Sequence, residues 1–315
     1  MTLLRERFVR SLGAPPLIAT AVAFSERHLR ILAYHGVADR HAFEQHLLHI
    51  CEQYNPVDPQ AVLDAVDGGP PLPRRPVWIT FDDGDPTVVE AGQPLLDLYQ
   101  IHATLLVCPG VIDTDEPYWW QIVTDALDQG IEIGPSERPW GGKASLAELK
   151  RLPDEGRRAV VAKLAEETTV RTGAKPTRRQ LTTAQLHRWA EAGHQVGNHT
   201  WDHPCLDRCA EAEQVRQVQA AAEWLDGELP DGNLVFAYPN GNWASATEEE
   251  LRRLGVQVGL RFDHRLTRIS EPSLRWSRLR IDADAPLERF RAVLSGAHSG
   301  AFGAAQRVSR LLPRR

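Results

Sequence analysis

The sequence lacks the features that define several protein classes. Its four cysteines form no Cys-x-x-Cys pair, so neither a cysteine-rich zinc site nor a dense disulfide framework is expected, although two disulfides remain an alternative. No apolar run approaches about 18 residues, so we expect no transmembrane helix. Basic residues are in deficit, 36 against 42 acidic residues, and the net charge of −6 argues against a nucleic-acid-binding protein.

The composition, with 42% apolar and 25% charged residues, is typical of a soluble globular protein. At 315 residues the chain can bury a sizeable core as two domains or as one α/β barrel. Four free thiols favour a reducing compartment and hence a cytoplasmic location. A secreted or periplasmic location stays open, because the N-terminal segment 1–28 has arginines followed by an apolar stretch, as a signal peptide has. Residues 301–315 form a basic tail, for which we expect a solvated segment.

Candidate strands alternate with candidate helices between these ends. Short β-branched or aromatic runs bounded by Pro or Gly predict strands, and apolar residues at helical spacing predict helices. This alternation is typical of βαβ units with a parallel sheet, and about seven strands favour closure into a barrel, here expected over residues 29–300. The rhythm breaks at about 131–180, where polar, helix-forming sequence predicts a helical insertion near one rim.

Two adjacent carboxylates, Asp82 and Asp83, follow the strand-like residues 77–81 and precede a glycine. In α/β barrels the carboxyl ends of the strands carry the active site. Side chains splay apart at a strand end, so one Asp can bind a metal ion while the other faces a substrate. Two bare carboxylates this close would force one to keep a proton, and a cation beside them removes that conflict. The alternative is an ordinary Asp-Gly turn.

A second pair of candidate ligands, His199 and His203, follows the strand-like residues 195–198. The i, i+4 spacing places both imidazoles on one side if the segment turns helically, and such spacing is common among metal ligands. With Asp83 the pair gives a two-histidine, one-carboxylate set with open coordination positions. Such sets hold catalytic Zn²⁺, or Fe²⁺ in oxygenases, and the residues alone do not choose between the two metals.

Two further strand ends carry candidate groups. Residues Tyr238, Pro239 and Asn240 enter a turn that Pro and Gly fix, and such a turn can direct a backbone N–H at a developing oxyanion. His35 follows the first candidate strand, where a histidine can act as a general acid near neutral pH. Each has a plainer alternative, a simple strand exit for the turn and a structural histidine for His35.

The combination of motifs in this order resembles the polysaccharide deacetylases, carbohydrate esterase family 4, over about residues 29–294. The residues that carry the resemblance are Thr80-Phe81-Asp82-Asp83-Gly84, His199-Thr200-Trp201-Asp202-His203 and Tyr238-Pro239-Asn240-Gly241. Tyr34-His35 and Trp119-Trp120 are similar to an exopolysaccharide-linked bacterial branch. The resemblance implies a distorted, incomplete (β/α) barrel, and a divalent metal, most often zinc, held by Asp83, His199 and His203. It also implies Asp82 as the general base.

The sequence departs from the family pattern in two places. Family members commonly have an arginine that orients the base two residues before the motif proline, where this chain has Ala237; we expect Arg280, from a later strand, to replace it. The usual C-terminal acid motif is also unclear. His298 is a poor match for it. In the branch that this sequence resembles, the acid histidine lies near the N-terminus in a Tyr-His pair, so the resemblance implies His35 as the acid, a position that barrel closure brings beside the last strand.

The expected reaction is removal of N-acetyl groups from amino-sugar poly- or oligosaccharides with release of acetate. The alternatives are a hydrolase of cyclic amides or ureides on the same scaffold, a non-catalytic carbohydrate-binding relative, and a non-haem iron oxygenase, against which the α/β pattern argues. The sequence leaves open the sugar, its chain length, the metal and the oligomeric state.

Overall fold

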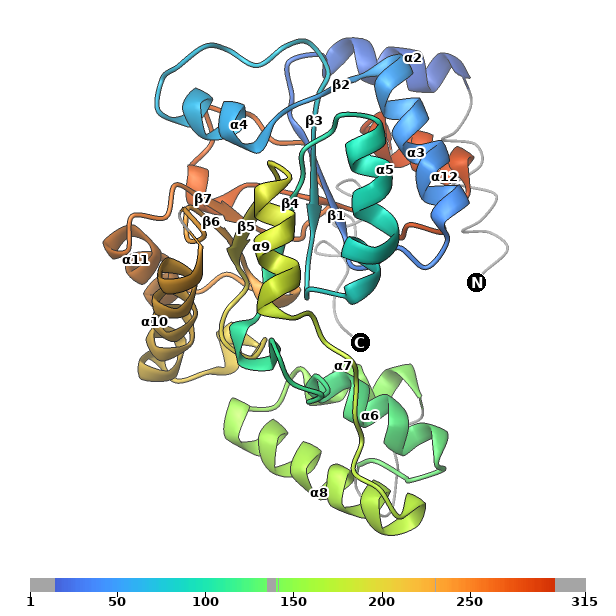
Figure 1. The fold of residues 1–315 in the computed structure, drawn as a ribbon, viewed down its shortest axis with the longest axis vertical. Coiled ribbons are helices and arrows are strands. Elements are labelled where there is room, and N and C mark those ends of the chain that lie inside the picture. Colours follow the sequence, from blue (N-terminus) through green and yellow to red (C-terminus); the bar gives the residue numbers. More distant parts are fainter. Residues whose placement is uncertain (1–14, 135–139, 141, 230, 298–315) are drawn as a thin grey trace, which may run out of the picture.

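The computed structural model describes residues 15–134, 140, 142–229 and 231–297. Short buried strands alternate with helices along the chain, and the helices lie outside a curled sheet (Figure 1). Each of the four cysteines is a free thiol. Among the described helices, none combines the length and the apolar character needed to cross a bilayer.

Seven strands form the sheet in the order β7-β6-β5-β4-β3-β1-β8, and a short eighth strand, β2, pairs with β3 outside this path. All the strand pairs are parallel. Their bounds are β1 Arg30–Tyr34, β2 Asn55–Pro56, β3 Pro76–Phe81, β4 Thr104–Val107, β5 Gln195–Asn198, β6 Val235–Ala237, β7 Val258–Leu260 and β8 Leu279–Arg280. Because β7 and β8 are the two ends of this order and the sheet curls, the fold is an incomplete (β/α) barrel, as predicted.

Most of the described helices connect successive parallel strands and cover the outer face of the sheet. Their bounds are α2 Pro15–Phe24, α3 Arg40–Gln53, α4 Pro59–Val66, α5 Gln93–Leu98, α6 Trp119–Asp128, α7 Lys143–Leu149, α8 Asp154–Thr172, α9 Thr183–Glu191, α10 Glu211–Glu228, α11 Ser245–Arg253 and α12 Leu287–Leu294. The segment 88–92 before α5 is a π-helix, and short 3-10 turns follow several strands.

Helices α6, α7 and α8 lie together between β4 and β5, below the rest of the barrel in Figure 1. They share an apolar cluster of their own that includes Val123, Leu149 and Leu164. The exact limits of the expected insertion, of the N-terminal segment and of the tail stay predictions, and residues 298–315 lie outside the described part of the chain.

Alternation along the strands decides which side chains enter the barrel. Ile31, Trp78 and Leu106 pack together inside it, whereas their neighbours Leu32 and Ile79 pack outward against the helices. Continuing the inner row of β3 past its last residue places the next side chain at the carboxyl-terminal mouth of the barrel. Polar groups at the ends of several strands therefore converge there.

Candidate active site

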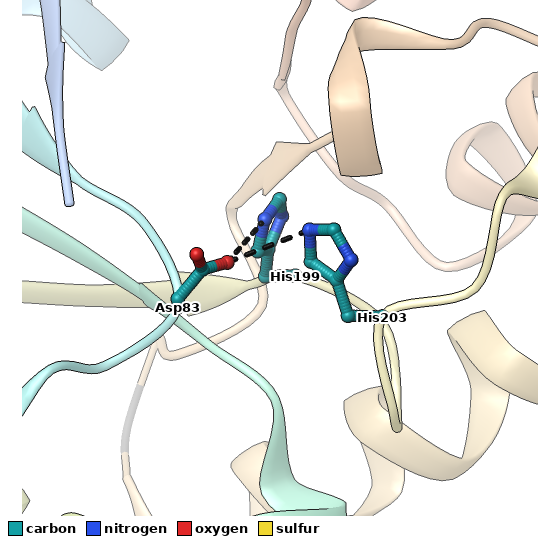
Figure 2. Close-up of side chains that lie close together, drawn as sticks. All are labelled: Asp83, His199 and His203. Atoms are coloured by element: carbon teal, nitrogen blue, oxygen red, sulfur yellow. Dashed lines mark ion pairs between the residues drawn. The ribbon is translucent and has the colours of Figure 1, made fainter. Parts of the chain in front are cut away.

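Asp83, His199 and His203 come together at the barrel mouth, although the loop that holds the two histidines does not turn helically. Asp83 follows β3, and the two histidines lie in the loop after β5; Figure 2 shows both imidazoles directed at one carboxylate. The Nε2 atoms of His199 and His203 each lie 3.4 Å from Oδ1 of Asp83. One ligand atom from each of the three residues lies within 4.8 Å of the others.

The hydrogen bonds of the three residues leave atoms with lone pairs, suited to bind a metal ion, directed at one point. Nδ1 of His199 donates to the carbonyl oxygen of Ala237 at 2.8 Å, which fixes the tautomer and leaves Nε2 with a free lone pair. Oδ1 of Asp83 is buried and accepts no hydrogen bond from the described residues. A buried carboxylate oxygen without a donor is costly, and a divalent cation between it and the two imidazoles would remove that cost. The donor set therefore fits a metal ion.

Several residues around the site have a left-handed backbone conformation. Asp83 and His203 have φ values of 69° and 58°, and Thr200 and Asn240 have 70° and 58°. Few non-glycine residues adopt positive φ, and such residues cluster at functional sites. Local hydrogen bonds hold the histidine loop in this conformation: the Thr200 amide donates to Oδ1 of Asn198 at 2.8 Å, and the His203 amide donates to the Thr200 hydroxyl at 3.2 Å.

The protonation states of the metal-free triad follow from burial and from the shared carboxylate. Burial lowers the pKa of His203 to about 3, against a smaller opposing effect of Asp83. Burial also opposes the charge on His199, but Asp82 and Asp83 outweigh it and raise the pKa of His199. Burial raises and the two histidines lower the pKa of Asp83, with a net lowering. His203 is thus held neutral and Asp83 ionised, the forms that bind a metal ion.

Asp82 has a different partner from its neighbour. Its Oδ1 and Oδ2 accept hydrogen bonds from Nη1 and Nη2 of Arg278 at 2.6 and 2.7 Å, and both side chains are buried. Nη1 of Arg278 also donates to the hydroxyl of Thr80 at 3.1 Å. Burial alone would raise the pKa of Asp82, but the charge of Arg278, with that of His199, lowers it. Asp82 is therefore an ionised carboxylate held in one orientation.

The expectation that Arg280 orients Asp82 is wrong. Arg278 and Arg280 lie two residues apart, so they face the same side of the chain, but Arg280 stands nearer the mouth. Arg280 on β8 pairs with Ala33 on β1, which in turn pairs with Thr80 on β3, so Arg280 lies level with Thr80. The backbone of Arg278 lies two residues deeper in the barrel, and its side chain extends toward the mouth and ends at Asp82. The side chain of Arg280 is 51% exposed, and its carboxylate partner is Asp282 at 3.6 Å.

His35 lies at the mouth next to both carboxylates. It is partly exposed, and its charge lowers the pKa of Asp82 and of Asp83. Its ring meets the ring of Phe262 edge to face, with centroids 5.8 Å apart. His298, the competing acid, lies outside the described residues. The structure thus brings His35 to the site and leaves its role as the acid a prediction.

The turn after β6 lies at the same mouth, but its three predicted residues differ in position. Tyr238 is fully buried, and its hydroxyl donates to the Leu274 carbonyl at 3.0 Å, so its side chain supports the fold. Pro239 begins a 3-10 turn in which the amides of Gly241 and Asn242 donate to carbonyls within the turn. Only Asn240 directs polar atoms away from the turn, toward Lys150 and Cys205.

Sequence reasoning assigned no role in the site to several residues around the triad. The hydroxyl of Tyr118 donates to the backbone carbonyl of Asp83 at 2.5 Å, and Trp120 lies between Tyr118 and His203, with ring centroids 4.4 and 4.5 Å away. Nε1 of Trp119 donates to the His203 carbonyl at 3.2 Å. The start of α6 therefore holds both ligand loops. Trp119-Trp120 was a visible signal of this, whereas Arg278 had none beyond its place beside Arg280.

Comparison with known protein families identifies the fold and the chemistry together. The family model described as polysaccharide deacetylase matches residues 69–135 and 159–259, more than half of the chain. This chain belongs to the polysaccharide deacetylase family. The two matched ranges include Asp82, Asp83, both histidines and the turn at 238–241. As a polysaccharide deacetylase, the protein is a hydrolase that acts on carbon–nitrogen bonds other than peptide bonds.

Solved structures with the same fold include three bacterial proteins. PplD, a deacetylase of Streptococcus pyogenes solved with acetate, has a TM-score of 0.59 at 19% identity, covering 85% of this chain and 99% of that one. IcaB of Ammonifex degensii has a TM-score of 0.57 at 20% identity, and the match covers 86% of this chain and 97% of IcaB. A de-N-acetylase of Aggregatibacter actinomycetemcomitans has a TM-score of 0.58 at 15% identity, and the match covers 84% of this chain and 99% of that one. A search of the curated proteins gives no match.

Proposed function

We propose that this polysaccharide deacetylase removes N-acetyl groups from amino-sugar poly- or oligosaccharides with the help of a divalent metal ion. The observation that carries the proposal is the separation of two adjacent carboxylates. Asp83 faces two imidazoles, and Asp82 is clamped by Arg278. One carboxylate is thereby arranged as a metal ligand and the other as a base, the two roles that metal-assisted amide hydrolysis needs.

Asp83, His199 and His203 would hold the metal, and Zn²⁺ suits a set of two imidazoles and one carboxylate best. When bound, it would supply Lewis-acid chemistry, polarising a carbonyl and lowering the pKa of water. The support for this ligand set is the buried, unpartnered Oδ1 of Asp83 and the fixed tautomer of His199.

Asp82 is the general base in this proposal. It accepts a proton from the attacking water while the oxygen of that water bonds to the acetyl carbon. Arg278 keeps the carboxylate ionised by lowering its pKa and fixes its direction through two hydrogen bonds. In this proposal the backbone N–H of Asn240 stabilises the negative charge that develops on the carbonyl oxygen, since the amides of its neighbours Gly241 and Asn242 donate within the turn.

His35 is the general acid in this proposal. As the carbon–nitrogen bond breaks, its imidazolium gives a proton to the departing sugar nitrogen, and acetate is left. Its position beside Asp82 and Asp83 at the first strand end supports this role. The Tyr34-His35 pair also underlies our assignment of the protein to the exopolysaccharide-linked branch.

Acetate release by the purified full chain tests the proposal. The protein is treated with a chelator, reloaded with Zn²⁺ or Co²⁺, and given N-acetylglucosamine oligomers or cyclic ureides. We expect metal-dependent acetate release from the oligomers only. Turnover of ureides without acetate release would favour the alternative hydrolase, and oligomer binding without turnover would favour a carbohydrate-binding protein.

Two histidine variants test the assignment of the acid. His35→Ala should bind metal normally and lose kcat by about 10²–10⁴-fold, because a general acid contributes that much. His298→Ala is the matched control and should retain activity. The reverse pattern, with His298→Ala inactive and His35→Ala active, would move the acid to the C-terminal end of the chain.

A further inference from the structure

Two cations that the proposed reaction does not use stand at the barrel mouth. Arg280 is one of them. It faces the same side as Arg278 but nearer the mouth, and its guanidinium carbon lies 5.8 Å from the ring centroid of Phe262, the ring that also contacts His35. Its carboxylate partner, Asp282, is 3.6 Å away and is shared with Arg289 at 3.7 Å. The carboxylate of Asp282 is thus shared between two arginines, Arg280 and Arg289.

Lys150 is the second cation, and it comes from the far side of the mouth. It follows α7, and its Nζ donates to Oδ1 of Asn240 in the turn after β6. The side chain is partly buried, and among the described residues Lys150 forms no ion pair with a carboxylate. All four lysines of the chain lie between positions 143 and 175, so the helical segment between β4 and β5 provides this charge.

Direct contacts connect the two cations. Lys150 forms a hydrogen bond with Asn240. The next residue, Gly241, packs so closely on Phe262 that a Cβ on the glycine would lie 2.5 Å from the Phe262 side chain. The guanidinium of Arg280 in turn packs over the ring of Phe262. Burial and the charge of Arg280 lower the pKa of Lys150, against opposing effects of Cys205 and Asp83. The mouth therefore holds two positive groups that repel each other, beside an Asp82 that Arg278 already neutralises.

We propose that Lys150 and Arg280 form an anion subsite, and that the substrate of this deacetylase is an acidic N-acetylated polysaccharide with a carboxylate near the acetamide. The inference rests on the proposed deacetylation. A sugar carboxylate between the two cations offsets their repulsion and gains charge-assisted hydrogen bonds. The acetate product is also a carboxylate, so the same cations have a second possible ligand, and the test separates the two.

The test compares two substrates that differ only in charge. They are N-acetylglucosamine oligomers of one length, either unmodified or with C6 oxidised to a carboxylate. For the Zn²⁺-loaded wild-type protein we expect kcat/KM to be about tenfold higher on the carboxylated oligomer, since hydrogen bonds to charged groups contribute on that scale. The preference should weaken with added salt, because the subsite is partly exposed.

Substitutions locate the origin of the preference. Lys150→Met and Arg280→Met should each bring the ratio of the two kcat/KM values close to one, and Lys150→Arg should keep it. The ratio is measured within one protein, so a general loss of activity does not alter it. Lys163→Met, on the exposed face of α8, and Arg188→Met, exposed on α9, are matched controls that should keep the wild-type ratio.

Each contrary result has a separate meaning. Equal kcat/KM on both oligomers in the wild-type protein, or a preference that survives the Lys150→Met/Arg280→Met double variant, overturns the subsite. If the variants are less inhibited by acetate but keep the wild-type ratio of the two kcat/KM values, the assignment to an acidic polysaccharide is overturned. The two cations would then bind the acetate product. Absence of acetate release from either oligomer would instead refute the proposed deacetylation.

Discussion

The two sides of the barrel mouth are built in different ways. On one side, the metal-ligand candidates come from two short loops that directly follow β3 and β5, and His199 and His203 lie four residues apart. On the other side, Asp82 depends on Arg278, which is 196 residues away in the chain. Asp82 and Arg278 are almost fully buried, whereas the side chain of Asp83 is 17% exposed. The comparison shows that a short motif and a contact between distant residues can both be essential to a site, although only the short motif can be recognised in the sequence.

The sharpest test of the metal side is Asp83→Ala. This change removes one of three ligands, so we expect the protein to lose bound metal and to lose turnover by more than about 10⁴-fold, beyond what a single general base contributes. Elemental analysis and acetate release measure the two effects on the same sample. Retention of metal by this variant would show that the three residues do not form the metal site.

Asp82→Asn tests whether the neighbouring carboxylate has a separate role. The amide keeps the shape of the side chain but cannot accept the proton, so kcat should fall by about 10²–10⁴-fold while metal content stays at the wild-type level. The same elemental analysis provides the control. If Asp82→Asn and Asp83→Ala lost metal equally, the division of roles between the two carboxylates would be wrong.

Arg278→Leu and Arg280→Leu test the long-range side of the comparison. Removal of Arg278 leaves the buried Asp82 without a partner, and we expect the free energy of unfolding to fall by about 3–5 kcal/mol. Removal of the exposed Arg280 should change it by less than about 0.5 kcal/mol. Denaturant unfolding of both variants beside the wild type measures the difference. Equal losses would contradict the assignment of Arg278 as the partner of Asp82.

An effect smaller than the loss of Arg278 concerns pH and the metal-free protein. The unfolded chain protonates His203 near pH 6.5, whereas the native protein resists this down to about pH 3 because the side chain is buried. Between these values the unfolded state binds more protons, so stability falls as the pH is lowered. At pH 5 the loss from this group should be about 2 kcal/mol relative to pH 7.

His203→Gln is the control for this pH effect. It lacks the titrating group, and the groups that titrate elsewhere are common to both proteins. Unfolding in the presence of a chelator at pH 7 and pH 5 should therefore show a smaller loss for the variant. An equal loss in both proteins would mean that His203 is not the group held neutral by burial.

The sequence by itself determined the alternation of parallel strands and helices, the placement of Asp82, Asp83, His199 and His203 at strand ends, and the turn at 238–241. These features follow from local periodicity, from Pro and Gly at strand exits, and from the rule that polar side chains after parallel strands meet at one edge. The tertiary structure alone decided which arginine reaches Asp82, because Arg278, just before β8, and Arg280, at its end, face the same side and only their depth in the barrel distinguishes them. It also decided that Trp120 packs on His203 and that Lys150 reaches the turn at Asn240. Such contacts depend on how far a side chain extends across the barrel, a distance that no spacing along the chain encodes.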